Sequence, residues 1–232
     1  MKIGILGAMD QEVAFIKDSL NDIVEHHYAH LTFYTGSLHG VEVVLVKCGI
    51  GKVAAAVATT VLIDRFAPDY VVNTGSAGGF DTELNIGDLV IATEVQHHDV
   101  DVTHFGYARG QVYGMPAIYP CDEKLIQAAE VAARDSIHVN SKRGLICTGD
   151  SFIGCDEAAA KLRELYPLMC AVEMEGAAIG QTCYLLETPF VVIRSLSDIA
   201  GKSSSMSFSQ YLEVAGKNSA QLVMSMIATL AA

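Results

Sequence analysis

Several runs of this chain are apolar at both odd and even positions, and these runs constrain its possible folds more than any other feature does. The segments VVNTG, LVIATEV and FVVIRSL show no alternation between apolar and polar side chains. Strands of this kind are typical of sheets that are covered by helices on both faces. Segments with helical spacing separate these runs along the chain. The alternation therefore predicts an α/β fold, with helices on both faces of a central sheet.

The same patterns predict the individual elements. Strands are expected at residues 2–6, 32–38, 42–49, 69–75, 88–95, 142–150, 169–175 and 190–198. Helices are expected at residues 10–20, 52–66, 157–166, 176–187 and 208–230. Residues 32–49 are expected to form a hairpin that turns at His39-Gly40. No low-complexity linker, charge block or repeat divides the sequence, so residues 1–232 are expected to form a single domain.

Net charge and cysteine usage limit the partners and the compartment. A net charge of −12 argues against a nucleic-acid or anionic-membrane partner. The first apolar run covers only about eight residues, which is too short for a secretory signal or a membrane span. The six cysteines are scattered without a CxxC motif, which indicates reduced thiols. The expected location is the cytoplasm.

Small or polar residues follow several of the expected buried strands. These positions include Glu12, Ser76, Glu175 and Asp198. In open α/β sheets, ligands bind at the carboxyl ends of the strands, so a site is expected where these four residues meet.

Each of these residues also has a purely structural interpretation. Glu12 could complement the dipole of helix 10–20, and Asp198 could cap a turn. Asp198 could instead hold a proton as a general acid, oriented by the hydroxyl of Ser197. Arg194 lies in an apolar strand, so we expect it to pair with a carboxylate, because an unpaired buried charge is costly.

Two glycine-rich segments resemble nucleotide-binding loops only superficially. GSAGG at residues 75–79 is not a GxGxxG motif, and no G-K-[ST] follows it, so neither dinucleotide nor nucleoside triphosphate binding is supported. GIGK at residues 49–52 opens a helix, where it could cradle a phosphate or form a plain tight turn.

The segment HHDVDVTH at residues 97–104 contains five groups that could bind a metal, namely His97, His98, Asp99, Asp101 and His104. Adjacent residues of a strand point to opposite faces, and no second group of ligands is evident elsewhere. We therefore favour a polar loop that leads to an aromatic tip at residues 105–107, suited to a lid or a partner contact. No metal or cofactor is expected.

Three carboxylates and a Gly/Ser loop suit acid–base chemistry on a glycosidic bond. One carboxylate activates water and another protonates the leaving group, while the transition state resembles an oxocarbenium ion. A third carboxylate could hold a vicinal diol by accepting both hydroxyl protons.

Seven segments together resemble one known family. They are IGILGAMDQEV, KCGIGKVAAA, VVNTGSAGG, HDVDVTHFGY, GDSFI, VEMEGAAI and RSLSD, in this order from residue 3 to residue 198. The chain is similar along its whole length to bacterial 5′-methylthioadenosine/S-adenosylhomocysteine nucleosidases. The resemblance implies one nucleoside phosphorylase-like α/β domain with a mixed, largely parallel, twisted sheet, and a homodimer without a cofactor. The implied reaction is hydrolysis of the N-glycosidic bond of either nucleoside, and of 5′-deoxyadenosine, with release of adenine.

The resemblance also implies a role for each site residue. Glu12 would activate water, Asp198 would protonate nitrogen 7 of adenine with help from Ser197, and Glu175 would bind the ribose hydroxyls. The remaining implied contacts are Phe152 and Ile153 with the purine, Ser76, Ala77, Gly78 and Met174 with the ribose side, Met9, Ile50 and Phe208 as apolar walls, Arg194 in the network near the water, and Val102 and Phe105 from the partner subunit over the 5′ group.

The chain departs from the family pattern in two places. AMDQEV stands where a run of acids is expected, although Glu12 is retained. Tyr113 stands where a proline is expected, which leaves the shape of the 5′ pocket and the preferred 5′ substituent open.

Two other functions fit parts of the pattern. A nucleoside phosphorylase would need a phosphate site with several arginines, but of the six arginines only Arg194 lies at an expected strand end. A non-catalytic nucleoside-binding protein would not need Glu12 or Asp198, and both are present. The pair Glu173 and Glu175 could be neighbours on a strand, but we expect Glu175 to bind the ribose and Glu173 to support the site, paired with Arg194.

Overall fold

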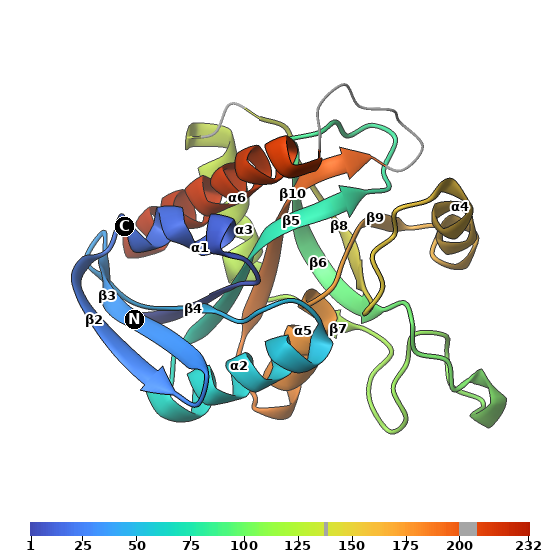
Figure 1. Cartoon of the computed structure of the whole chain (residues 1–232), viewed down its shortest axis with the longest axis horizontal. Coiled ribbons are helices and arrows are strands. Elements are labelled where there is room, and N and C mark those ends of the chain that lie inside the picture. The colour runs from blue at the N-terminus through green and yellow to red at the C-terminus, as the bar shows by residue number, and fades with distance from the viewer. Residues whose placement is uncertain (137–138, 200–207) are drawn as a thin grey trace.

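A sheet of ten strands organises the chain in the order β10-β6-β8-β9-β5-β1-β4-β3-β2, with β7 paired to β6 (Figure 1). The structure is a computed structural model that describes residues 1–136, 139–199 and 208–232, without the side chains of residues 136 and 208–210. The strands are β1 (Lys2–Gly7), β2 (Asn21–Tyr28), β3 (Leu31–Leu38), β4 (Val41–Lys47), β5 (Tyr70–Gly79), β6 (Leu89–His97), β7 (Tyr119–Pro120), β8 (Ser141–Thr148), β9 (Met169–Glu173) and β10 (Phe190–Ile199). The helices are α1 (Asp10–Lys17), α2 (Lys52–Phe66), the 3-10 helix η1 (Thr103–Phe105), α3 (Glu123–Ser136), α4 (Asp156–Leu165), α5 (Gly176–Leu185) and α6 (Phe208–Ala231).

The sheet is mixed, as expected. β1 lies parallel to β4 and β5, β5 lies parallel to β10, and β8 lies parallel to β6 and β9. The β2-β3-β4 meander and the pairs β5–β9, β6–β10 and β6–β7 are antiparallel. Because β10 pairs with both β5 and β6, the strands β5, β10, β6, β8 and β9 form a closed ring within the larger sheet.

Helices cover the sheet in two groups. α6 packs against α1, α3, β5 and β10, and α2 packs against α5 on the other side (Figure 1). Strand residues between the groups, such as Ile5, Val72 and Ile193, are fully buried. Covering both faces explains why these strands read as continuous apolar runs, and the predicted α/β class is confirmed. Within the described residues, none of the helices combines the length and apolar character that a membrane crossing requires.

Four elements lie outside the predicted ranges: β2, the two-residue strand β7, the 3-10 helix η1 and α3. β2 forms the end of the β2-β3-β4 meander, and its first five residues are exposed, so it has no apolar face to recognise. α3 has a clear amphipathic pattern, because Leu125, Ile126 and Ala129 are buried at helical spacing. The predicted hairpin is present as β3 and β4, and both turn residues, His39 and Gly40, have positive φ angles.

The end of β9 differs from the prediction in a way that matters for the site. The strand ends at Glu173, and Glu175 is the N-cap residue of α5 instead of the last residue of a strand. The two glutamates are therefore not arranged as neighbours along an extended strand.

The register of the sheet brings the ends of several strands together. Leu6 of β1 lies opposite Asn73 of β5, and Gly78 near the end of β5 lies opposite Asp198 of β10 and Val172 of β9. An irregularity between Leu196 and Asp198 shifts the β10 register at this point. Such irregularities re-aim side chains next to functional sites.

Candidate active site

A cavity of about 500 Å³ lies where β1, β5, β9 and β10 end. Two loops complete it, one between β4 and α2 and one between β8 and α4. The lining residues are Ala8, Met9, Glu12, Ile50, Ser76, Ala77, Gly78, Ser151, Phe152, Ile153, Val172, Glu173, Met174, Glu175, Ser197 and Asp198. The structure thus brings together the four strand-end residues that the sequence singles out.

Glu12 enters the cavity from the first turn of α1 and is 1% exposed. One carboxylate oxygen accepts hydrogen bonds from the backbone N–H groups of Ala8 and Met9 at 2.8 and 3.1 Å. The other accepts hydrogen bonds from the backbone N–H and the hydroxyl of Ser76 at 2.9 and 3.1 Å. These four hydrogen bonds fix the position of the carboxylate in the cavity.

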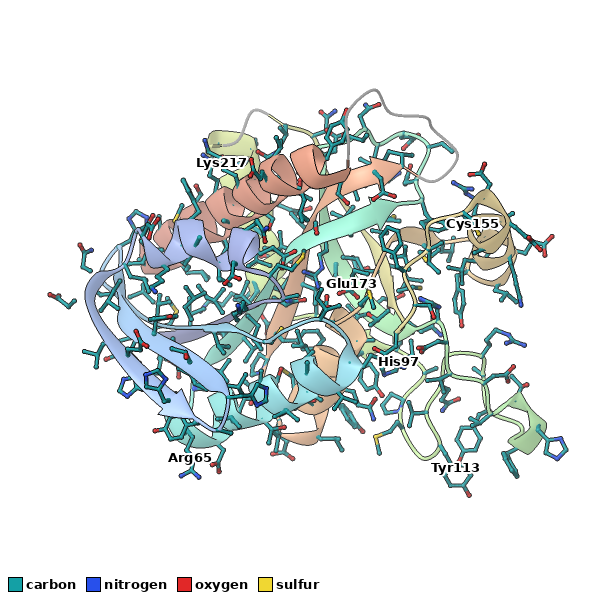
Figure 2. The ribbon with its side chains drawn as sticks, viewed as in Figure 1. Arg65, His97, Tyr113, Cys155, Glu173 and Lys217 are labelled. Carbon is teal, nitrogen blue, oxygen red and sulfur yellow. The ribbon has the colours of Figure 1, made fainter. Side chains whose placement is uncertain are left out.

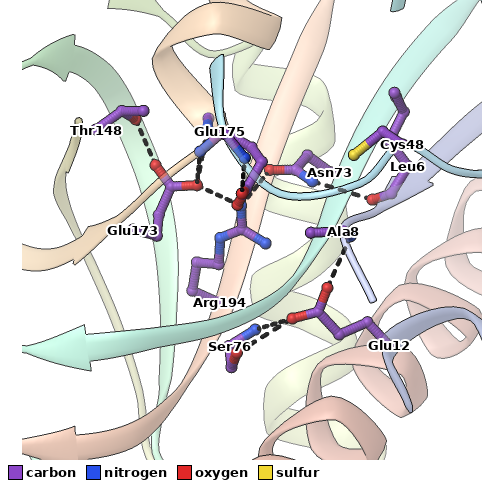
Figure 3. A network of polar contacts seen from close by, with 12 residues as sticks. Leu6, Ala8, Glu12, Cys48, Asn73, Ser76, Thr148, Glu173, Glu175 and Arg194 are labelled. Carbon is purple, nitrogen blue, oxygen red and sulfur yellow. Dashed lines mark hydrogen bonds and ion pairs between the residues drawn. The ribbon is translucent and has the colours of Figure 1, made fainter. Parts of the chain in front are cut away.

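Arg194 is fully buried behind the cavity and joins two glutamates (Figure 3). Its Nη2 donates to Glu173, to Asn73 Oδ1 at 2.6 Å and to Glu175 Oε2 at 3.4 Å. Asn73 in turn donates through Nδ2 to the carbonyl of Leu6 at 3.0 Å. The expected pairing of Arg194 with a carboxylate is therefore present, and Asn73 ties it to the end of β1.

Glu173 is fixed as an acceptor on all sides. It accepts hydrogen bonds from the hydroxyl of Thr148 and from the backbone N–H groups of Glu175 and Gly176, the latter two at 2.9 and 2.7 Å. Burial acts to raise the pKa of Glu173, but the charge of Arg194 and these hydrogen bonds outweigh it and lower the pKa. Glu173 thus caps α5 as a carboxylate. Although it lines the cavity, its oxygens are occupied by hydrogen bonds from the protein.

Glu175 has the opposite electrostatic environment. Burial, followed by the negative charge of Glu173, raises the pKa of Glu175 to about 7. Its Oε1 accepts a hydrogen bond from the backbone N–H of Gly51 at 2.9 Å, from the turn before α2. A carboxylate with one donor on each oxygen keeps lone pairs for two further hydroxyl donors, as a vicinal diol would supply.

Gly75 allows this network to assemble. A side chain at this position would overlap Arg194 Nη1 and the carboxylate of Glu12. The absence of a Cβ lets the two charged groups lie close together against the β5 backbone. This requirement explains the first glycine of GSAGG better than a nucleotide-binding loop does.

Asp198 lies across the cavity from the network, at the shifted end of β10. Ser197 donates its hydroxyl to Asp198 Oδ1 at 2.9 Å. Burial raises the pKa of Asp198, although the hydrogen bond from Ser197 acts to lower it. A raised pKa favours the protonated form and therefore suits a general acid.

Apolar side chains form the outer walls of the cavity. Met9, Ile50, Phe152, Ile153 and Met174 line it, as the sequence prediction requires. The outer walls are open, because Ile50 is 58% exposed and Phe152 is 66% exposed. Phe208 is also a predicted wall residue, but its side chain lies outside the described residues.

Val102 and Phe105 do not line this cavity. They belong to a loop between β6 and β7 that projects away from the body of the chain, with Tyr113 at its tip (Figure 2). Phe105 and Tyr113 are both 67% exposed, and their ring centroids are 6.3 Å apart. A projecting aromatic tip agrees with the sequence interpretation of this segment as a lid or partner contact.

The side chains of the histidine-rich segment at residues 97–104 contact other parts of the protein. His97 Nε2 hydrogen-bonds Gln181 at 2.9 Å, the ring of His98 lies against Gly149, and Asp99 pairs with Lys52 at 2.7 Å. Burial lowers the pKa of both histidines. The described part of the chain contains no group of three or more His, Cys, Asp or Glu side chains that could hold a metal.

Sequence reasoning missed Asn73 and Thr148, which are both fully buried and polar. Thr148 Oγ1 accepts a hydrogen bond from the backbone N–H of Ala177 at 2.7 Å, so its own proton is directed to Glu173. The available signal was a polar residue near the end of each apolar strand run, VVNTG and GLICT.

The geometry supports acid–base chemistry on one bound molecule. A buried carboxylate at Glu12 and a protonatable carboxyl at Asp198 line the same cavity, and Glu175 lines it between Gly51 and Arg194. Apolar walls on the loop side suit a flat ring.

Known proteins that are similar to this chain in sequence and shape include nucleosidases. The family model of the phosphorylase superfamily matches residues 2–228. The 5′-methylthioadenosine/S-adenosylhomocysteine nucleosidase of Psychromonas ingrahamii is 55% identical over 230 residues, which are 99% of this chain and 100% of that protein. The crystal structure of the Colwellia psychrerythraea nucleosidase with adenine has a TM-score of 0.95 and 54% identity, and covers 99% of this chain and 96% of its own. The Neisseria meningitidis nucleosidase with methylthio-immucillin-A has a TM-score of 0.94 and 46% identity, and covers 98% of each chain.

Proposed function

The chain belongs to the 5′-methylthioadenosine/S-adenosylhomocysteine nucleosidase family of the phosphorylase superfamily, and on this premise we propose that it hydrolyses the N-glycosidic bond of both nucleosides. The products are adenine and the corresponding 5-thioribose, and 5′-deoxyadenosine is a further substrate. The observation that carries the proposal is that Glu12, Glu175 and Asp198 line a single cavity with apolar outer walls.

Asp198 starts the reaction by donating its proton to nitrogen 7 of adenine. Adenine then leaves as a neutral base, and the bond to the anomeric carbon breaks with positive charge developing on the ribose. The raised pKa of Asp198 supports this role, because the proton must be present before the bond breaks. Ser197 orients the carboxyl through its hydroxyl.

Glu12 and Glu175 act on the ribose side. Glu12 takes a proton from the attacking water, whose oxygen bonds to the anomeric carbon, and Ser76 holds the carboxylate in place. Glu175 accepts hydrogen bonds from the ribose 2′- and 3′-hydroxyls, with Met174 beside the sugar. Arg194 keeps Glu175 in position, and the carboxylate of Glu173 balances the positive charge of Arg194.

The purine occupies the outer part of the cavity. Phe152 and Ile153 contact the base, Met9 and Ile50 form the apolar walls, and Ala77 and Gly78 line the ribose side. The same assignment makes Phe208 a wall residue. No metal or cofactor takes part in the proposed reaction.

The assay that tests the proposal measures free base by chromatography. The protein is incubated with methylthioadenosine, adenosylhomocysteine, 5′-deoxyadenosine, adenosine and inosine, each with and without phosphate. We expect adenine release from the three 5′-modified substrates without phosphate. Strict dependence on phosphate would contradict hydrolysis, and binding without any release would indicate a non-catalytic protein. The cavity itself favours hydrolysis, since none of the six arginines, all within the described residues, lines it.

We further propose that the working form is a homodimer of single-domain chains, in which Val102 and Phe105 cover the 5′ group in the partner subunit's site. The projecting loop supports this, because its aromatic tip is exposed and lies outside the cavity of its own chain. Mixing two inactive variants tests the arrangement. The Phe105→Ala subunit retains Asp198, and the Asp198→Asn subunit retains Phe105. In a mixed dimer these two residues meet in one of the two sites, so that site should recover activity.

We also place the protein in the cytoplasm. Six free cysteines support a reducing compartment, where thiols persist. Fractionation of the native cell, followed by detection of the protein with an antibody, tests this location.

A further inference from the structure

Three loops meet beside the cavity at a cluster of charged residues that do not line it. The cluster consists of Lys52, Asp99 and Asp150. Lys52 is the first residue of α2, Asp99 follows β6 at the base of the projecting loop, and Asp150 follows β8. The residues are far apart in the sequence, so the contacts fix how the three loops lie relative to one another.

The contacts form a closed triangle. Lys52 Nζ donates to Asp99 Oδ1 at 2.7 Å, and the backbone N–H of Asp150 donates to Asp99 Oδ2 at 2.9 Å. The backbone N–H of Lys52 donates to Asp150 Oδ1 at 2.8 Å, which satisfies one of the free N–H groups at the start of α2. Each residue therefore bonds the other two.

The triangle is more enclosed than a surface ion pair of this chain such as Lys47 and Asp10. The side chains of Lys52 and Asp99 are 20% and 26% exposed, whereas those of the pair Lys47 and Asp10 are 47% and 79% exposed. Burial acts to raise the pKa of Asp99, but the hydrogen bonds from Lys52 and Asp150 outweigh it and lower the pKa. Partial burial reduces solvent screening, so this pair is stronger than a typical surface pair.

Two corners of the triangle, Lys52 and Asp150, continue directly into groups at the cavity. Gly51, next to Lys52, donates its N–H to Glu175 at 2.9 Å. Ser151, Phe152 and Ile153 follow Asp150 and line the purine side of the cavity. The triangle therefore connects Gly51, which holds the ribose-binding carboxylate of Glu175, to the loop that contacts the base.

We propose that Lys52, Asp99 and Asp150 form a positioning clamp, which sets the spacing between the ribose-binding and purine-binding walls of the cavity. The proposal rests on the nucleosidase function proposed above. None of the three residues lines the cavity, so they act through Gly51 and residues 151–153. Glu12 and Asp198 lie on α1 and β10, outside the clamped loops, so the clamp controls substrate binding more than bond cleavage.

Substitution of Lys52 and Asp99 tests the clamp. We expect Lys52→Met and Asp99→Asn each to raise KM for methylthioadenosine and the dissociation constant of adenine about three- to tenfold. The value of kcat and the pH profile of kcat should stay within about twofold, because proton transfer by Glu12 and Asp198 is not altered. The double variant should be no worse than either single variant, since both remove the same interaction.

Asp150 provides the conservative comparison. Asp150→Asn retains a side-chain oxygen that can accept the backbone N–H of Lys52. Asp150→Ala removes that acceptor. We expect Asp150→Asn to keep a near-native KM and Asp150→Ala to raise KM, although both variants lose the charge.

Lys142→Met is the matched control. Lys142 pairs with Asp81 and Glu83 at 2.6 and 2.7 Å, and none of these three residues lines the cavity. Melting temperatures are measured for all variants. If Lys52→Met lowers the melting temperature but leaves KM and adenine affinity unchanged, as Lys142→Met should, the cluster is only structural and the clamp is wrong.

Adenine titration by calorimetry separates this proposal from the proposed function. Failure of the native protein to release adenine from any nucleoside would overturn the function, whatever the variants do. Hydrolysis by the native protein together with unchanged adenine affinity in Lys52→Met and Asp99→Asn would overturn only the clamp.

Discussion

Two large hollows of the molecule differ in their lining residues, and this difference shows why only one of the two is a candidate active site. The larger, about 610 Å³, lies between β7, the end of α5 and the start of β10, and is lined by residues such as Tyr119, Cys183 and Phe190. The smaller, about 500 Å³, lies at the opposite ends of the strands and contains Glu12, Glu175 and Asp198. Volume does not separate them, but convergent carboxyl groups do, since the smaller hollow holds Glu175 and Asp198, whose pKa values are raised by burial.

The titratable groups buried around the larger hollow have little tendency to ionise. Burial raises the pKa of Tyr119 to about 12 and the pKa of Cys121 to about 12, so both stay neutral. The hydroxyl of Tyr119 has no hydrogen-bond partner among the residues that the structure describes. In the smaller hollow, one guanidinium serves two carboxylates, those of Glu173 and Glu175. The following predictions test this contrast.

The largest effect is expected at Asp198. Asp198→Asn removes the proton donor but preserves shape, so kcat should fall about 10²- to 10⁴-fold with little change in substrate affinity. Asp122→Asn in the larger hollow is the control, because Asn can still accept the hydrogen bond that Asp122 receives from Leu125. Steady-state kinetics on both variants gives the comparison. Substantial turnover by Asp198→Asn would show that the acid lies elsewhere.

The next effect concerns the charge that holds the smaller hollow together. Arg194→Met leaves Glu173 buried without a cation, and we expect the free energy of unfolding to fall by about 3–5 kcal/mol. Arg143→Met removes an arginine that bonds Glu130 and Glu123 but is 35% exposed, so it should cost at most about 1 kcal/mol. Urea denaturation of both variants measures the difference. Equal losses would contradict the special role of the buried guanidinium.

Two buried hydroxyls, one in each region, should respond differently to removal. Thr148→Val deletes a hydroxyl that accepts from Ala177 and donates to Glu173, and should cost about 1–3 kcal/mol. Tyr119→Phe deletes a hydroxyl without a partner, so it should be neutral or slightly stabilising. Thermal unfolding of both variants provides the test. A clear loss of stability in Tyr119→Phe would indicate that this hydroxyl has a partner in solution.

The smallest effect is a pH dependence. The pKa of Glu175 is about 7 in the folded chain and its ordinary value is 4.5, so the folded state binds more protons between these values. This group therefore makes the chain less stable as pH rises from 4.5 toward 7. Ribose binding needs the carboxylate, so KM should fall a few-fold as pH rises through 7.

Glu175→Gln is the control for this dependence, because glutamine does not titrate. Its KM should be higher and should not change with pH between 6 and 8. A native KM that is constant over the same range would show that Glu175 is already ionised below neutrality.

The sequence predicts the fold class and the position of the site because both depend on local patterns. Apolar runs identify buried strands, and the residues that follow them converge at one end of the sheet. The exposed strand β2 has no such pattern. The helix predicted from Gly176 is present, but the strand predicted over residues 169–175 ends two residues earlier, at Glu173, whose carboxylate caps the start of α5.

Contacts between distant residues could not be predicted from the sequence. Arg194 and Asn73 are 121 residues apart, and Lys52 and Asp150 are 98 apart, so no local spacing connects them. Only the register of the strands brings each pair together. The roles proposed for the site residues remain predictions until the variants are measured.

The closed ring of β5, β10, β6, β8 and β9 holds the proposed acid and the Arg194 network apart from the loops that contact the rest of the substrate. Asp198 and the network of Glu173 and Arg194 lie on or beside strands of the ring, whose hydrogen bonds on both sides allow little movement. Phe152 and the tip at Phe105 lie on loops outside it. Loop changes, such as Tyr113, can therefore alter which 5′ substituent is accepted during evolution while the reacting groups keep their geometry.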